Sequence, residues 1–338
     1  MPPNNGEKSR LDDAARAGWL YYIAGNTQDE IAGKLKISRA AAQRLVSLAL
    51  SERLITFRLD HPITGCMELA ARLAERYRLK HCDVVPTDAH NPASVAGVAA
   101  SAAAYLEQML TATRPIIIAL GTGRTLRAAV DQIRPMACPH HQLVSLVGNI
   151  APDGSASFFD ALTRLADLTQ ARHYPIPLPV VAATPKERDL LIAIEPVKRV
   201  RELAARADLT VVGVGQMDSE AQQFIDGFIT RQELVDLLRE GAAGEVVGWA
   251  YDSEGHIFGG GTNARCTSVP HRPHDDRLVV GVAVGPAKVR SIDAALAGNI
   301  LTGVITDEAT ATALLALPEQ NLMRQEKRPI RKQKRLTS

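Results

Sequence analysis

The 338-residue sequence has few aromatic residues, few cysteines and no long apolar run. Aromatics make up only 4% of the chain, which argues against the stacking platforms that bind single-stranded nucleic acid. The four cysteines stand far apart, so we expect buried thiols and a reducing cytoplasm rather than a disulfide framework. No stretch approaches the ~20 apolar residues needed to span a bilayer, and the first residues lack the apolar core of a signal peptide. We therefore expect a cytoplasmic protein with no membrane partner.

Length and composition favour an ordinary globular protein of two domains. Hydrophobic residues make up 46% of the chain and charged residues 22%, a balance typical of folded domains, and 338 residues exceed one ordinary core. The net charge of +2 excludes no class of partner. Basic residues gather at the end, where 324–338 hold seven Lys or Arg against Glu326 alone. We expect a solvated tail there; the alternative is an arm that adds sequence-independent attraction to phosphate.

The stretch from Thr27 to Leu50 predicts a helix-turn-helix. Thr27 followed by Glu30 has the spacing of a capping box, so a first helix should begin there. The apolar pattern breaks at Lys36, and Ser38 is a good N-cap for a second helix. The buried face of this second helix is expected to consist of Ala42, Leu45, Val46 and Ala49.

Three further features fit this motif. Small Ala32 lets two steeply crossed helices approach, and Ile37 can fill the corner between them. Lys36 takes the hinge place that glycine often holds, where a strained non-glycine residue is tolerated. A helix over about 11–24 supplies the third element of the bundle. Its side chains expected to face inward are Trp19, Leu20 and Ile23.

The outward side of the second helix carries residues suited to the major groove. Arginine can grip guanine and glutamine can grip adenine, and Arg39 and Gln43 lie in the first turns, where a recognition helix meets base edges. The alternative is a plain helical hairpin with a solvated polar face. We predict that double-stranded DNA is contacted by Thr27, Gln28, Ser38, Arg39, Ala40, Gln43, Arg44 and Ser47.

The next segments link this motif to the rest of the chain. Residues 54–59 alternate between two faces, which predicts a short strand or wing, with Arg53 and Arg58 near phosphate. The pattern over 65–79 returns to a helix that connects two domains; it could pair with a second copy or dock on its own large domain. We place a helix-turn-helix, winged-helix-like domain at 1–62, the connector at 63–80, a large domain at 81–320 and the basic tail at 321–338.

The large domain alternates strand-like runs with helical patterns. Runs such as 116–120 and 279–284 are short and continuously apolar, as in parallel strands covered on both faces. This alternation predicts an open α/β fold. The expected strands lie at 82–87, 115–120, 141–148, 173–181, 209–215, 244–252, 277–285 and 301–308, and the expected helices at 92–112, after 123, from 157, at 231–240, at 286–297 and after 308.

Polar loops follow several of these strands, where open α/β folds bind ligands. Glycines at 121 and 123 let backbone amides turn toward an anion at a helix start. Lys288, in the first turn of a helix, opposes the usual dipole preference, which indicates a ligand that offsets its charge. Each loop alone could be purely structural, but together they predict a pocket for a small oxygen-rich ligand. The loops are 121–125, then Asn149, Asp153 and Ser155, then Gly213, Gly215, Gln216 and Asp218, and lastly Lys288.

The chain from about Ala17 to Leu317 resembles the SorC family of bacterial sugar-binding transcriptional regulators. The resemblance rests on the helix-turn-helix and on "GTGRTL", "VVGVGQM", "YDSEG" and, most specifically, "GPAKVRSIDAALAGNILTGVITDEATA" at 285–311. It implies a large domain with the fold of sugar-phosphate isomerases and glucosamine-phosphate deaminases, reused as a sensor for a sugar, polyol or sugar phosphate. It also implies a dimer or tetramer on the operator of a carbohydrate-use operon.

The resemblance also implies which residues bind the effector. It places the loop 121–124, Asp252 and Lys288 in the pocket. Combined with the polar loops, the predicted effector-binding set is Gly121, Thr122, Gly123, Arg124, Thr125, Asn149, Gly215, Gln216, Asp252 and Lys288.

The alternative function is a sugar-phosphate isomerase or deaminase-like enzyme with an appended DNA-binding domain. That chemistry needs a carboxylate or histidine within about 3 Å of the reacting atoms. Asp252, Glu254 and His256 resemble the "DGHI" signature of the deaminases but follow a different strand, and the run after "VVGVG" lacks histidine. We therefore predict a sensor that is not an enzyme. The sequence "CPHH" at 138–141 could pass for metal ligands, but no second pair follows, so we expect a surface loop, no metal and no cofactor.

Overall fold

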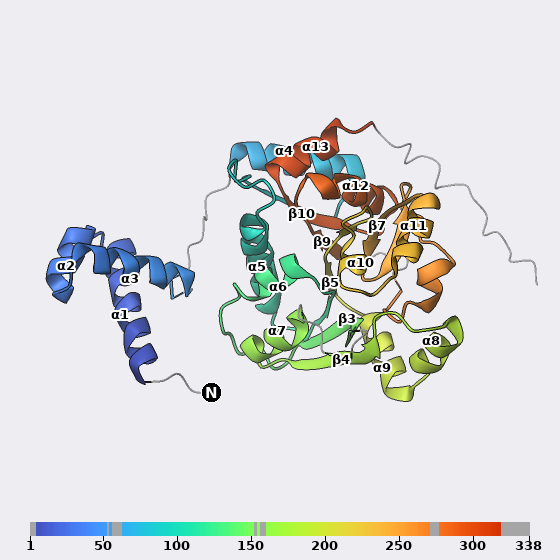
Figure 1. Ribbon diagram of the computed structural model, residues 1–338, viewed down its shortest axis with the longest axis horizontal. Coiled ribbons are helices and arrows are strands. Elements are labelled where there is room, and N and C mark those ends of the chain that lie inside the picture. Colours follow the sequence, from blue (N-terminus) through green and yellow to red (C-terminus); the bar gives the residue numbers. More distant parts are fainter. Residues whose placement is uncertain are drawn as a thin grey trace, which may run out of the picture. The chain divides into compact units, whose positions relative to one another are not determined.

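The computed structural model describes residues 5–52, 54–55, 63–151, 154–155, 160–270 and 277–318, with side chains from residue 9 onward. The chain divides into two compact units, Met1–Pro62 and Ile63–Ser338. Figure 1 shows the helices of the first unit in the darker blues and those of the second from the light blue of its first helix through green and yellow to red. The predicted strand or wing, with Arg53 and Arg58, falls outside the described residues apart from 54–55, and the basic tail at 321–338 also lies outside them.

The first unit contains the predicted helix-turn-helix. Its helices are α1 (Asn5–Tyr22), α2 (Gln28–Leu35) and α3 (Arg39–Ser51). The capping box is confirmed, because the Thr27 hydroxyl accepts from the Glu30 amide at 3.3 Å and the Glu30 carboxylate accepts from the Thr27 amide at 2.8 Å. The Ser38 hydroxyl accepts from the Ala41 amide at 3.2 Å, which confirms the second cap.

The turn between α2 and α3 uses a left-handed lysine. Lys36 has φ 56° and ψ 44°, and its amide donates to the carbonyls of Ala32 and Gly33. Ile37 packs against the small core that contains Ile31, Ala42 and Val46. A non-glycine residue in this region of backbone space is strained, and the closed turn and the packing of Ile37 hold it there.

The inward face of α1 differs from the sequence prediction. Trp19 and Ile23 are 55% and 65% exposed and Leu20 is half-buried, whereas Ala14 and Ala17 are fully buried. A Cβ built on Gly18 would lie 2.7 Å from the Cβ of Ala49 on α3. The helices cross so closely that small residues must occupy the contact, and the large apolar side chains are displaced to the surface.

A sheet of seven parallel strands forms the centre of the second unit, as the sequence predicted. Its spatial order is β1-β10-β9-β5-β2-β3-β4. The strands are β1 (His81–Val85), β2 (Ile117–Leu120), β3 (Gln142–Ile150), β4 (Arg172–Pro179), β5 (Leu209–Val212), β9 (Val279–Val282) and β10 (Gly303–Asp307).

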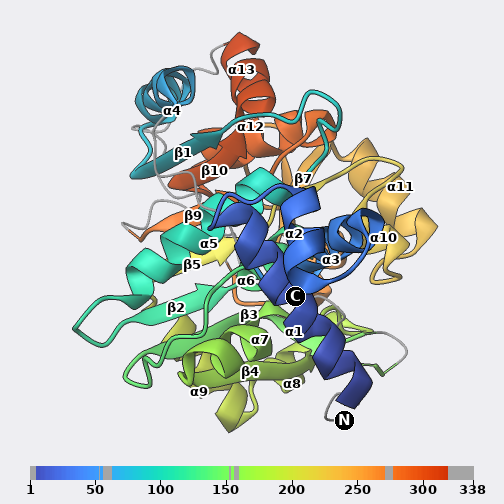
Figure 2. The same ribbon diagram turned by 90° about the vertical axis from the view of Figure 1, so that its left-hand side faces the viewer.

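Helices cover both faces of this sheet, as Figure 2 shows. Alternate residues of β2 pack in different cores: Ala119 packs with Val197, Ile292 and Leu314, and Ile118 packs with the helices at 96–110, 124–130 and 161–169. The helices are α4 (Thr64–Tyr77), α5 (Ala96–Leu110), α6 (Arg124–Val130), α7 (Ala161–Thr169), α8 (Pro185–Ile192), α9 (Glu195–Ala204), α10 (Gln222–Ile225), α11 (Arg231–Arg239), α12 (Val289–Ala297) and α13 (Glu308–Ala316). Two short 3-10 turns, η1 (Gly261–Arg265) and η2 (Pro286–Lys288), complete the unit. Helices α8, α9 and α10 are not among the helices expected from the sequence.

The strand predicted at 244–252 is instead a hairpin. It consists of β7 (Ala242–Val246) and β8 (Trp249–Asp252), which pair antiparallel, and β6 (Gly215–Gln216) adds a third strand. The turn is Val247-Gly248, with φ of 48° and 89°. Positive φ at both central residues gives a tight hairpin turn that matches the twist of the strands. Valine rarely adopts this conformation, so the sequence carried no turn signal here.

The connector helix α4 docks on its own unit, one of the two alternatives left open. Leu73 and Tyr77 are buried, whereas Met67 is 57% exposed. Both views place α4 beside α13 (Figures 1 and 2), and the Arg76 guanidinium donates to the carbonyls of Leu315 (3.0 Å) and Leu317 (2.9 Å) at the end of α13. No helix in the described ranges is both long and apolar enough to cross a membrane.

The cysteines and the "CPHH" segment have structural surroundings. All four cysteines are free thiols; three are buried and Cys82 is partly buried. His141 is fully buried rather than at the surface: Nδ1 accepts from the Ile116 amide at 3.2 Å, and Nε2 lies 3.1 Å from the Leu110 carbonyl. His140 is exposed and lies 3.0 Å from the Ala112 carbonyl. Within the described residues, no group of three His, Cys, Asp or Glu side chains is arranged to hold a metal ion.

Candidate functional site

The candidate site lies where the order of strand addition in the parallel sheet reverses. The chain passes from β2 to its neighbour β3 on one side, whereas the next sheet strand after β5 is β9, on the other side. Because β2 and β5 are adjacent, the loops at their carboxyl ends diverge and leave a crevice between them. A pocket of about 980 Å³ occupies this position.

Loops from four strands line the pocket. Residues 122–126 follow β2, residues 213–216 follow β5, residues 284–288 follow β9, and Ala151 and Ser155 follow β3. The structure therefore brings together seven predicted residues: Thr122, Gly123, Arg124, Thr125, Gly215, Gln216 and Lys288. Gly121 is buried just behind this wall, where a Cβ would lie 3.2 Å from Val247 Cγ1 and 3.3 Å from Val212 Cγ1.

Other predicted residues lie elsewhere. Asn149 does not line the pocket, although its neighbour Gly148 does. Asp252 is also absent from the lining; its carboxylate accepts from the amides of Glu254 (2.9 Å) and His256 (2.8 Å) and caps the turn after β8. The hairpin tip reaches the pocket, and Asp252 stands four residues further along β8, roughly 13 Å away at ~3.3 Å per residue. Unlike the prediction, the structure places Asp252 outside the residues that line this pocket. Asp153 lies outside the described residues, and Asp218 does not line the pocket.

Glu245 is a pocket residue that the sequence analysis missed. It lies on β7, deep in the unit, and lines the pocket. Its carboxylate accepts from the Gly248 amide at 2.8 Å and from the Gln223 side chain at 3.4 Å. A Cβ on Gly215 would lie 2.8 Å from Glu245 Cγ, so glycine is needed there to admit this side chain. Glu245 sits inside a run that looked like one continuous strand, and no sequence signal pointed to it.

Charges of both signs face the pocket. Burial raises the pKa of the Glu245 carboxyl, and the Gly248 amide and the charge of Lys288 oppose that shift. Burial lowers the pKa of the Lys288 ammonium; Glu245 opposes this shift and Arg124 adds to it. The two desolvated groups attract each other across a polar cavity. A ligand rich in hydroxyls can donate to the carboxylate and accept from the ammonium.

Helix α10 forms another part of the pocket wall. The Arg124 guanidinium donates to the Gln222 side chain at 2.6 Å, and Gln222 donates to Asp226 at 2.6 Å. The chain of hydrogen bonds ties the loop after β2 to α10. With Glu220 and Asp226 also in the lining, three carboxylates and two cations of the described residues surround the cavity.

Comparisons with known proteins agree on one family. Residues 61–316, more than half of the chain, match the family described as "Putative sugar-binding domain". The chain is 31% identical over 305 residues to the erythritol catabolism regulatory protein EryD of Brucella abortus (strain 2308), covering 90% of this chain and 96% of that protein.

The chain belongs to the SorC family of sugar-binding transcriptional regulators.

A further relative and a solved structure are also similar to this chain. The transcriptional regulator LsrR of Klebsiella pneumoniae subsp. pneumoniae is 28% identical over 315 residues, covering 90% of this chain and 92% of that protein. The full-length sorbitol operon regulator SorC from Klebsiella pneumoniae shares the fold, with a TM-score of 0.67 at 21% identity over 90% of this chain and 98% of that chain. This SorC-family regulator therefore combines a helix-turn-helix unit with a sugar-binding domain.

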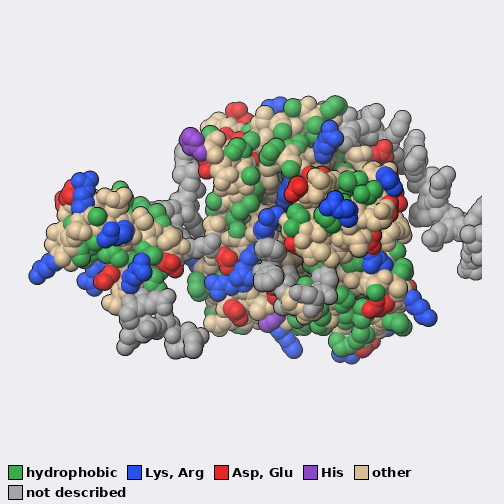
Figure 3. Space-filling model, viewed as in Figure 1, with side chains coloured by type: hydrophobic (Ala, Val, Ile, Leu, Met, Phe, Trp, Pro, Cys, Tyr) green, Lys and Arg blue, Asp and Glu red, His purple; other side chains and the backbone are tan. Residues whose placement is uncertain are grey.

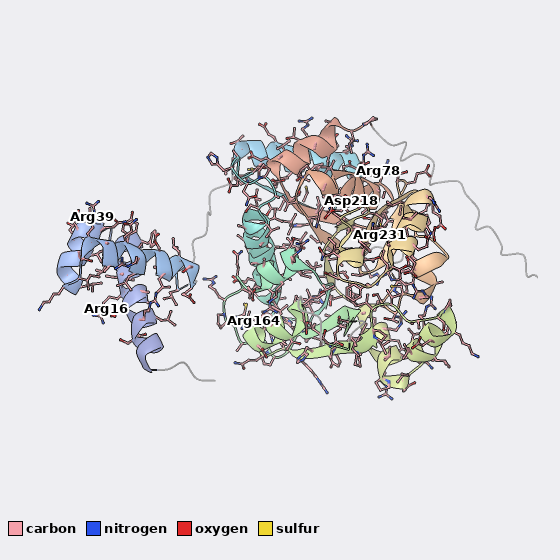
Figure 4. All side chains as sticks on the ribbon, in the orientation of Figure 1. Arg16, Arg39, Arg78, Arg164, Asp218 and Arg231 are labelled. Carbon is pink, nitrogen blue, oxygen red and sulfur yellow. The ribbon has the colours of Figure 1, made fainter. Side chains whose placement is uncertain are left out.

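The helix-turn-helix of this regulator presents the predicted DNA-contact residues to solvent. Basic side chains are visible on the first unit in Figure 3, and Figure 4 labels Arg39 there. The Arg39 guanidinium lies 3.5 Å from the Asp29 carboxylate, and both side chains are about two-thirds exposed. Such a surface pair is weak and leaves Arg39 available. The exposed members of the predicted set are Thr27, Ser38, Arg39, Ala40, Gln43, Arg44 and Ser47, and Gln28 is half-buried.

Proposed function

We propose that α3 reads operator DNA and that a small carbohydrate bound in the pocket between β2 and β5 changes operator affinity. The observation that carries this proposal is the convergence of the predicted loops after β2, β5 and β9 on one cavity, with Arg124 and Lys288 in its lining. The chain that builds this cavity also carries a capped helix-turn-helix with exposed Arg39 and Gln43. Arginine and glutamine are the side chains that pair with guanine and adenine.

The effector class follows from the groups that line the cavity. Carboxylate, ammonium, guanidinium and amide groups together supply the donors and acceptors that hydroxyl groups require. We propose a sugar, polyol or sugar phosphate. EryD, at 31% identity, is named for erythritol catabolism, so a four-carbon polyol is the first compound to test.

We further propose that the pocket binds its ligand without converting it. His256, the histidine of the deaminase-like "DSEGHI" stretch, is exposed and lies 3.3 Å from the Asp252 carboxylate. Neither residue is among those lining the pocket. For the deaminase-like stretch to act as general acid or base, one of these two residues would have to lie within about 3 Å of the reacting atoms.

The proposed assembly is a homodimer or tetramer on DNA, with residues 1–62 as the DNA-binding domain and 81–320 as the effector domain. Paired recognition helices fit half-sites about 34 Å apart or a multiple of it. An effector that favours one arrangement of the subunits shifts this spacing. A coupling of 1–3 kcal/mol would change operator affinity roughly 5- to 150-fold.

Fluorescence anisotropy with labelled DNA from beside the gene tests the proposal. The full chain is titrated at fixed salt with excess nonspecific competitor, with and without erythritol, sorbitol and their monophosphates. One compound should shift competitor-resistant binding. The same panel is assayed for turnover, and conversion of a compound would support the enzyme alternative.

Two substitutions divide the roles. Arg39→Ala should weaken specific binding by about 1–3 kcal/mol, while Arg16→Ala, which removes the same charge from α1, should change it less. Lys288→Ala should keep effector-free DNA binding and lose the response. Unchanged operator affinity in Arg39→Ala would remove the recognition-helix assignment, and a normal response in Lys288→Ala would remove that residue from the effector site.

A further inference from the structure

A buried hydrogen bond joins the connector helix to the helix that starts at the pocket. The Tyr77 hydroxyl on α4 donates to the Asp293 carboxylate on α12 at 2.6 Å, and the two residues are only 8% and 6% exposed. Burial and this bond raise the pKa of the Tyr77 phenol, so the hydroxyl keeps its proton. The Tyr77 hydroxyl is therefore the donor of this bond at neutral pH.

Helix α12 leads from the pocket to this bond. Lys288 lines the pocket and is the N-cap of α12, and Asp293 follows five residues later, roughly 7.5 Å along the axis at 1.5 Å per residue. Between them, the Ser291 hydroxyl donates to the Ala243 carbonyl of β7 at 2.7 Å. The Tyr251 hydroxyl of β8 donates to the Ser291 carbonyl at 3.0 Å. Helix α12 is thus bonded to the hairpin that carries Glu245.

The packing of α12 favours movement as one piece. Eight of its nine residues are buried, Arg290 being the exception. Closely packed helices shift as rigid elements between discrete positions rather than deforming gradually. A displacement at Lys288 would therefore appear at Asp293.

A second contact runs in parallel through α13. The Gly285 amide, in the pocket loop, donates to the Thr310 hydroxyl of α13 at 3.0 Å. Arg76, next to Tyr77 on α4, holds the carbonyls of Leu315 and Leu317 at the far end of α13. The carboxyl end of α4 is thus bonded to α12, which begins at the pocket, and to α13, which is bonded to the pocket loop at Gly285. The first residue of α4, Thr64, stands two residues after the end of the DNA-binding unit in the sequence.

We propose that the Tyr77–Asp293 hydrogen bond transmits effector binding at Lys288 to α4, and through the chain to the DNA-binding unit. Tyr77 and Asp293 are positioning residues, since neither is among the residues that line the pocket. A bond from a buried donor to a carboxylate is costly to break, so α4 follows α12 when a ligand favours one position of that helix. This inference rests on the proposed function, with the effector in the pocket and DNA on α3.

The test compares operator affinity with and without effector in single variants of the full chain. The effector probe is whichever of erythritol, sorbitol or their monophosphates shifts the wild-type protein most. Tyr77→Phe keeps the ring and removes only the hydroxyl. Asp293→Asn keeps a side-chain oxygen that can accept the hydrogen bond from the Tyr77 hydroxyl. Tyr174→Phe is the matched control. Tyr174 lies on β4, and its hydroxyl accepts a hydrogen bond from the Gln142 side chain at 3.1 Å. Strand β4 is at the opposite edge of the sheet from β1, the strand on which α4 packs.

In Tyr77→Phe, the ratio of operator dissociation constants with and without effector should fall by roughly 5-fold or more toward 1. Effector affinity of the variant, measured calorimetrically without DNA, should stay within about 3-fold of wild type. Asp293→Asn should keep part of the effector response that Tyr77→Phe loses, and Tyr174→Phe should respond to effector as the wild type does. Hydrogen exchange of the amides at 64–77 should change on effector binding in wild type and not in Tyr77→Phe.

Each outcome separates this inference from the proposed function. If no compound shifts the wild-type protein, the proposed function fails and the inference fails with it. If wild type responds and Tyr77→Phe keeps the full ratio, only the inference is overturned. If Tyr77→Phe loses effector affinity together with thermal stability, the bond is structural and the inference is likewise overturned.

Discussion

Replacing Gly18 with alanine should destabilise the N-terminal unit, although alanine is the better helix former. A Cβ at this position would lie 2.7 Å from Ala49 Cβ and 2.5 Å from Ile55 Cδ1. Ile55 can rotate aside, but the Ala49 Cβ is fixed to the backbone of α3, so the two helices would have to separate. Overpacking of this kind costs about 1–3 kcal/mol, against a gain of about 1 kcal/mol in helix propensity. The expected net effect is a loss of up to about 2 kcal/mol.

Tryptophan fluorescence can isolate this effect. The chain has two tryptophans, Trp19 on α1 and Trp249 in the second unit, so a Trp249→Phe background reports the first unit alone in urea unfolding. Gly33→Ala on α2 is the matched control: nothing lies within 4 Å of its Cβ position, and the unit should gain about 0.4–1 kcal/mol. An unfolding midpoint for Gly18→Ala above that of the unsubstituted background would refute the close crossing of α1 and α3.

Three further predictions concern the second unit. Burial lowers the pKa of His141, so the unfolded chain binds a proton that the native state excludes. The free energy of unfolding should therefore fall as the pH drops through about 6.5, and it should fall less in His141→Asn. Urea unfolding midpoints at pH 7.5 and 5.5 would measure this difference. Gly215→Ala should push Glu245 out of place and weaken effector binding about 10-fold or more by calorimetry, with effector-free operator affinity unchanged; wild-type effector affinity would contradict this packing. Asp252→Ala should cost about 1 kcal/mol of unfolding free energy and leave effector affinity within about twofold, whereas a tenfold loss would place its carboxylate in the pocket.

Much of the fold could be predicted because its local signals and tertiary contacts agree. Thr27 with Glu30 and Ser38 stand where helices begin, and continuous apolar runs at 116–120 and 279–284 become central parallel strands. The failures occur where packing overrides pattern. On α1 the apolar periodicity selected Trp19 and Ile23, but close approach to α3 selected alanine and glycine instead.

The pocket could be predicted only where residues lie directly after parallel strands. The loops after β2, β5 and β9 meet because the carboxyl ends of parallel strands share one edge of the sheet. Glu245 and Asp252 break this rule, since both belong to the small antiparallel sheet. Which end of a hairpin reaches a pocket depends on the position of its turn. Valine is rare in such turns, so Val247 gave no sign in the sequence that the chain turns there. Glu245 is in the pocket and Asp252 outside it because the chain reverses between them.

Local backbone rules are broken at both candidate sites. Lys36 in the helix-turn-helix and Val247 at the pocket both have positive φ, and Val247 is a β-branched residue, for which this conformation is most strained. The Val247-Gly248 turn is held by the bond from the Gly248 amide to Glu245 and by packing of Val247 against Gly121. A ligand hydroxyl that donates to Glu245 would compete with the bond that holds this turn. Since β7 is also bonded to α12, strain stored at the pocket is positioned to bias the helix that reaches Tyr77.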